Sequence, residues 1–121
     1  MSTLNEPLML VLSLAPQAKA RPRVTSKGTY MPRAYQTWRK DFVAACNEVE
    51  WSPVVGPFAI GIKFVTKTGS MRPDLDNAVG ACLDALQDAG VIENDRDCKK
   101  LSAEMVKGKR TQIEIELRGA A

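Results

Sequence analysis

Apolar residues recur at every second position in several segments, which predicts β-strands with one buried face. The clearest is 58–66, and 112–117 follows the same alternation. The apolar run at 7–14 predicts a mostly buried strand. A further strand is expected at 99–107, and the turn at Gly108 makes it antiparallel to the strand that follows.

Two other segments have apolar residues at helical spacing. After Pro32, this spacing predicts an amphipathic helix over 33–50. A second helix is entered at 74–77 and ends at Gly90, a residue suited to the left-handed conformation after a helix. The stretch 17–32 is expected to be an extended basic arm or a short hairpin.

Together these elements predict one small α+β (mixed α/β) domain over residues 1–121, with a mixed sheet and two main helices. The hydrophobic content of 45% and charged content of 26% are those of an ordinary globular protein. The short apolar N-terminal run predicts neither a membrane span nor a leader, so a cytoplasmic protein is expected. Cys46, Cys82 and Cys98 form no paired motif, which favours a reducing compartment and buried thiols.

The sequence contains no histidine, so histidine-based nucleases and histidine-containing hydrolase triads are excluded. The net charge of +3 is mild, but its distribution is uneven. Residues 19–40 contain seven basic and no acidic side chains, interleaved with Tyr30, Tyr35 and Trp38. This segment is suited to a phosphate backbone, although Tyr35 and Trp38 are expected in the helix core.

Asp74 and Asp76 are two carboxylates at the entry of the second helix. Mg²⁺ prefers such oxygen ligands and retains water, so the pair suits phosphodiester hydrolysis. Alternatively, Asp76 or Asn77 caps the first helical turn, and this reading is the stronger one for the short motif by itself. Asp95 follows a helix about 22 Å long, so its spacing does not bring it beside Asp76.

An ordered set of motifs carries a resemblance to a known family. The chain contains Asp74-Leu75-Asp76-Asn77, Asp84-Ala85-Leu86, Ala89-Gly90 and Asn94-Asp95, with Arg21-Pro22-Arg23, Gly28 and Tyr30 upstream. This order resembles the RusA-type Holliday junction resolvases over most of the chain. The resemblance implies a small mixed α/β homodimer, often phage-borne, that nicks four-way DNA junctions symmetrically in recombination and repair.

The resemblance also implies roles for individual residues. Asp74, Asp76 and Asp95 would be catalytic and hold Mg²⁺, with Mn²⁺ as a possible replacement. Side chains expected to contact DNA are Arg21, Arg23, Lys27, Lys67 and Arg72, which would orient it through phosphates. For Arg21 and Arg23, an exposed basic loop without such a role is an equal alternative. Asn77 and Asp84 are candidates to support the metal ligands, and a structural hydrogen bond is an equal alternative for Asp84.

Two positions depart from the family pattern. Gly80 stands where the family often has a lysine, and Asn94 replaces the first of two paired aspartates. Lys63, Lys67 or Lys99 could supply the missing positive charge. A catalytically impaired protein that binds junctions is therefore the main alternative. A phosphatase with Asp74 as nucleophile fits less well, because no apolar strand precedes that residue.

Overall fold

The computed structural model describes residues 7–120. Its elements in chain order are β1 (Leu8–Leu12), β2 (Arg23–Thr25), β3 (Gly28–Tyr30), α1 (Arg33–Cys46), β4 (Phe58–Thr66), α2 (Leu75–Ala89), the short 3₁₀ helix η1 (Asp95–Asp97), β5 (Cys98–Lys107) and β6 (Gln112–Gly119). No helix in this range is long and apolar enough to cross a membrane.

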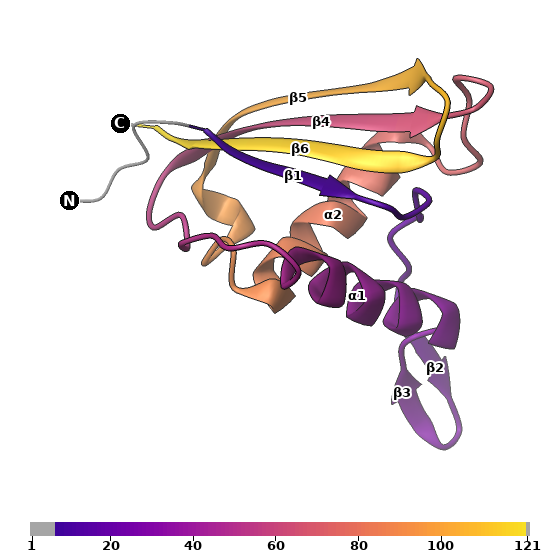
Figure 1. Cartoon of the computed structure of the whole chain (residues 1–121). Helices are drawn as coiled ribbons and strands as arrows, with labels where there is room; N and C mark the ends of the chain where they lie inside the picture. The colour runs from indigo at the N-terminus through magenta and orange to yellow at the C-terminus, as the bar shows by residue number, and fades with distance from the viewer. Residues whose placement is uncertain (1–6, 121) are drawn as a thin grey trace.

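The main sheet has four strands in the order β1-β6-β4-β5. Strand β6 is antiparallel to both β1 and β4, whereas β5 is parallel to β4. Helices α1 and α2 both lie on one face of this sheet, and no helix of residues 7–120 lies on the other face (Figure 1). The structure therefore confirms the predicted α+β class, with a mixed sheet and two main helices.

The core lies between the sheet and the two helices. Alternate residues of β4 point into it, as the sequence predicts, and Phe58 and Phe64 are completely buried. Tyr35 and Trp38 pack there from α1, which confirms their expected core position. Cys46 and Cys82 are also buried, and burial raises the pKa of the Cys46 thiol to about 11. Such thiols serve as small apolar side chains.

The last two strands differ from the prediction in their pairing. Strands β5 and β6 run in opposite directions, but β4 lies between them, so they do not form a hairpin. The reason is the crossover through α2, which returns the chain parallel to β4 on its far side. This topology leaves β5 as an edge strand.

The first helix is shorter than its apolar pattern suggests. It ends at Cys46 instead of continuing to residue 50, and Val49 is 50% exposed. The indole Nε1 of Trp51 donates a hydrogen bond of 2.9 Å to the Cys46 carbonyl. This side chain satisfies a carbonyl that another helical turn would otherwise have used.

The basic segment before α1 contains a hairpin. Strands β2 and β3 pair antiparallel, with Arg23 opposite Tyr30. At the turn, the Thr25 hydroxyl donates to the Gly28 carbonyl at 3.0 Å. Every residue from 21 to 30 is exposed, and the hairpin projects from the domain near the start of α1 (Figure 1). Its charged residues are thus presented to solvent.

Candidate active site

Asp74 and Asp76 lie at the start of α2. Asp74 is the residue just before the helix and has an extended backbone, as expected for a residue that follows Pro73. Its carbonyl accepts the first helical hydrogen bond, from the Ala78 N–H at 3.0 Å. The helix therefore fixes the backbone position of both aspartates and directs its positive dipole end towards them.

The carboxylates of these two aspartates are not used to build the fold. The Asp74 side chain makes no capping hydrogen bond. Both residues are exposed, and neither side chain has a hydrogen bond or ion pair with any residue in the range 7–120. A pure helix-capping role requires a side-chain bond to the first N–H groups, and this bond is missing here. Both carboxylates are consequently available to an external ligand.

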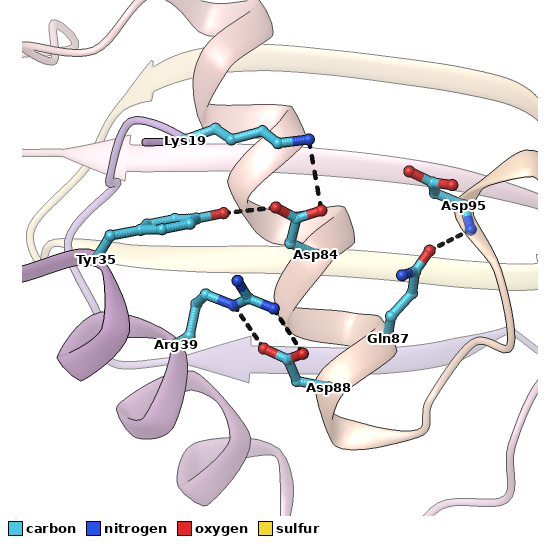
Figure 2. Close-up of polar contacts among 7 residues, drawn as sticks. All are labelled: Lys19, Tyr35, Arg39, Asp84, Gln87, Asp88 and Asp95. Atoms are coloured by element: carbon cyan, nitrogen blue, oxygen red, sulfur yellow. Dashed lines mark hydrogen bonds and ion pairs between the residues drawn. The ribbon is translucent and has the colours of Figure 1, made fainter. Parts of the chain in front are cut away.

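Asp95 is held at the other end of α2. Its backbone N–H donates to the side-chain carbonyl of Gln87 in the last turns of that helix (Figure 2). The Asn94 side chain accepts from the Arg96 N–H at 2.9 Å and so begins η1. Gln87 lies about 16 Å along the helix axis from Asp76. Asp95 therefore has a fixed backbone, but it is remote from the two other aspartates.

The crossover explains this separation. Asp74 follows the end of β4, whereas Asp95 precedes the beginning of β5. Because β4 and β5 are parallel, these two positions lie at opposite ends of the sheet. Within residues 7–120, no three acidic or cysteine side chains are grouped closely enough to hold a metal ion. One chain thus brings Asp74 and Asp76 to one end and leaves Asp95 at the other.

Two polar contacts join α1 to the middle and end of α2. The Tyr35 hydroxyl donates to Asp84 at 2.8 Å, and the Arg39 guanidinium makes two hydrogen bonds to Asp88 at 2.6 and 2.7 Å (Figure 2). Burial, followed by the bond to Asp84, raises the pKa of Tyr35. The phenol therefore remains a neutral donor. Asp84, a candidate to support the metal ligands, makes this interhelical contact.

A comparison with protein families gives the decisive match. The model of the family described as endodeoxyribonuclease RusA matches residues 13–118. The chain belongs to the RusA family. It is therefore a RusA endodeoxyribonuclease with the Holliday junction resolving activity of DNA recombination and repair. No individual curated protein matches the chain.

The structure shows what occupies the space beside Gly80, where RusA proteins often have a lysine. A Cβ atom at Gly80 would lie 3.2 Å from Cδ of Lys19. The Lys19 N–H donates to the Asn77 carbonyl at 3.2 Å, and its ammonium lies 3.6 Å from Asp84. The aliphatic part of Lys19 therefore covers Gly80 and places a positive charge along α2.

The sequence pattern does not distinguish Lys19 from the other charges of the basic segment. The feature of the sequence that points to it is Gly80, a small residue in the first half of a helix that otherwise has apolar residues at regular spacing. Such a residue allows another chain segment to approach closely. The lysines that the sequence suggests for this charge lie elsewhere: Lys63 is on β4, Lys67 is in the loop after it, and Lys99 is on β5.

The basic residues expected to contact DNA form two groups. Arg21, Arg23 and Lys27 belong to the projecting basic arm and hairpin, and Lys67 and Arg72 lie in the loop that leads to Asp74. All five are exposed, and none makes an ion pair within the described part of the chain. They are free to contact phosphate groups.

Proposed function

We propose that this RusA protein nicks four-way junctions symmetrically as a Mg²⁺-dependent homodimer, with Asp74, Asp76 and Asp95 as its catalytic carboxylates. The supporting observation is that Asp74 and Asp76 are exposed, have no side-chain partner within residues 7–120, and are fixed at the start of α2. A two-fold dimer suits the substrate, because resolving a junction requires two related cuts. The cytoplasm, where cellular DNA is accessible, is the proposed location.

The residues present fit a hard divalent cation. The candidate ligands are carboxylates in a chain without histidine, and oxygen ligands of this kind suit Mg²⁺ and, as a replacement, Mn²⁺. When bound, such an ion activates water and neutralises charge on the phosphate undergoing hydrolysis. Asp74 and Asp76 would hold it, while Lys67 and Arg72 in the adjoining loop would orient the phosphate backbone.

Asp95 can join this site only from a second chain. Within one chain it lies at the far end of α2 from Asp76. A two-fold dimer in which the two α2 helices run antiparallel would place the start of one helix near the end of the other. Each of the two proposed sites then contains Asp74 and Asp76 of one subunit and Asp95 of the partner subunit.

The hairpin is the proposed substrate-binding arm. It carries Arg23 and Lys27 outside the domain, and Tyr30, which is 51% exposed, lies opposite Arg23 on the same side of the hairpin. An exposed aromatic ring beside basic side chains suits an unpaired base and its neighbouring phosphates. This composition favours recognition of DNA shape over recognition of sequence.

A junction-cleavage assay tests the proposed function. The purified protein, incubated with a labelled four-way junction and Mg²⁺, should produce nicks at symmetric positions in two strands and none with chelator. A linear duplex with the sequence of one arm is the control and should stay intact. Tight junction binding without nicks in Mg²⁺ or Mn²⁺ would contradict catalysis and favour a protein that only binds junctions.

Lys19 is proposed to supply the positive charge that RusA proteins often carry at the position of Gly80. Replacing Lys19 with alanine should slow nicking by about 10- to 100-fold, because a charge that stabilises the reacting phosphate is lost. Adding Gly80→Lys to that variant should restore most of the rate, since the new side chain fills the vacated space. Single-turnover nicking at saturating protein measures both effects.

The control for the Lys19 variants is Lys40→Ala, which removes an exposed lysine from α1. It should cleave at the wild-type rate. If Lys19→Ala cleaves normally, or if the second substitution fails to restore cleavage in a variant with an unchanged melting temperature, Lys19 does not have this role.

A further inference from the structure

Strand β5 is a long strand at one edge of the described sheet. It has ten residues and pairs only with β4 within residues 7–120, whereas the opposite edge strand, β1, has five. Proteins usually cover or shorten a long edge, because its free N–H and C=O groups pair readily with another strand. We propose that β5 pairs antiparallel with β5 of a second copy, about a two-fold axis at Ser102.

This inference rests on the proposed function, because it specifies how a dimer completes the two-chain acidic site. It joins the two four-stranded sheets into one continuous sheet. The two β5 edges are then paired, and β1 of each copy forms an edge of the joined sheet. The helices of both copies lie on the same face, since a two-fold axis perpendicular to the sheet preserves its faces.

Apolar side chains on β5 favour the proposal that a second copy of the chain covers this edge. Leu101 and Met105 are 48% and 39% exposed, although the residues beside them on β4, Ile60 and Phe64, are buried. They therefore point towards the helix side of the sheet, where the helices leave them partly exposed. In a pairing centred on Ser102, a second β5, with its strand axis about 4.8 Å away, would place Ala103 of the partner subunit opposite Leu101 and the aliphatic part of the partner's Lys99 opposite Met105.

The charges on the two faces of β5 select one register. A pairing centred on Ser102 places Lys100 opposite Glu104 of the partner subunit, and the symmetry repeats this pair. A register centred on Ala103 would place Lys99 opposite a second positive charge at Lys107. Opposite charges facing each other across strands are favourable, and like charges are unfavourable. The sequence of β5 is thus complementary to itself about Ser102.

The same pairing brings Asp95 of the partner subunit to the end of the sheet that carries Asp74 and Asp76. Antiparallel pairing places the start of the partner's β5 beside the end of β5 in the first chain, at Lys107. A Cβ at Gly69 would lie 3.6 Å from the Lys107 backbone nitrogen, so the loop leading to Asp74 adjoins this end. The partner's Asp95, just before its β5, is then directed to the end that carries Asp74 and Asp76.

Disulfide trapping tests the proposed interface. In a Cys98→Ser background, Ser102→Cys should form a covalent dimer on mild oxidation, because its two copies face each other at the axis. Cys46 and Cys82 are buried and should not interfere. The matched control is Val11→Cys on β1, the other edge strand, which is also exposed and should remain monomeric on a denaturing gel.

A charge exchange tests the register. Lys100→Glu should weaken dimerisation at least about tenfold, because it faces Glu104 of the partner twice in each dimer. Adding Glu104→Lys should restore the dimerisation constant, which sedimentation measures without DNA. An unchanged constant in the single variant, or a covalent dimer through position 11 instead of 102, would overturn the interface.

These tests are separable from the test of catalysis. A protein that nicks junctions but does not cross-link through position 102 would disprove the β5 interface and leave the proposed function intact. A protein that cross-links there but never nicks would support the interface and contradict catalysis.

Discussion

Replacing Asp76 with asparagine is expected to abolish junction nicking while leaving junction binding intact. The amide keeps the size of the side chain but removes the charge needed to hold a divalent cation. Single-turnover nicking should fall by at least about 10²- to 10³-fold, the scale seen when a group that stabilises the transition state is removed. Binding in chelator should stay equal or tighten, since one negative charge near the phosphates is lost.

The structure also predicts that this substitution leaves the fold intact. The Asp76 side chain is exposed and has no partner within the described range, so only its interaction with the helix dipole is lost, about 0.3–1 kcal/mol. Asp41→Asn, which changes an exposed carboxylate on α1, is the matched control and should cleave normally. If the Asp76→Asn protein nicks at the wild-type rate, Asp76 is not a catalytic residue.

The sequence predicted the elements whose apolar pattern is set by a single packed face. Residues 58–66 form β4 as expected, because every second side chain enters the core. The second helix ends at Gly90, which has the left-handed φ of 79° anticipated for that position. In these segments, local pattern and tertiary packing favour the same structure.

Features that depend on contacts distant in sequence were not predictable. Val49 continues the apolar spacing of α1, yet the helix ends before it, because the Trp51 side chain bonds to the Cys46 carbonyl. The insertion of β4 between β5 and β6 likewise follows from the crossover through α2. Neither the spacing of apolar residues nor the Gly108 turn contains that information.

The candidate site was predicted in part for the same reason. The motif at Asp74 and Asp76 is local in sequence. In the structure, neither carboxylate makes a helix-capping hydrogen bond within the described residues. The contact between Lys19 and Gly80 depends on how the basic arm before α1 passes over α2. The spacing of apolar residues does not predict that course. For Asp95, the sequence predicts only that the length of the second helix separates it from Asp76. The structure agrees, because Asp95 lies near Gln87 at the far end of α2.

Mixing two inactive variants is expected to restore nicking if each site is shared between subunits. In a mixed dimer of Asp76→Asn and Asp95→Asn chains, one proposed site carries both substitutions. The other site combines the intact Asp74 and Asp76 of one chain with the intact Asp95 of its partner. If each site instead belonged to one chain, both sites of the mixed dimer would contain a substitution.

Subunit mixing therefore tests the shared carboxylate site most directly. The two variants, co-expressed with different tags or refolded together, are assayed on a labelled four-way junction with Mg²⁺, beside each variant alone. Random association makes about half of the dimers mixed, so about a quarter of the wild-type number of sites should be active. Nicking at that level, absent from either variant alone, is the predicted result. Isolated mixed dimers that are as inactive as the parent variants, while wild-type protein nicks the same junction, would contradict a site divided between two chains.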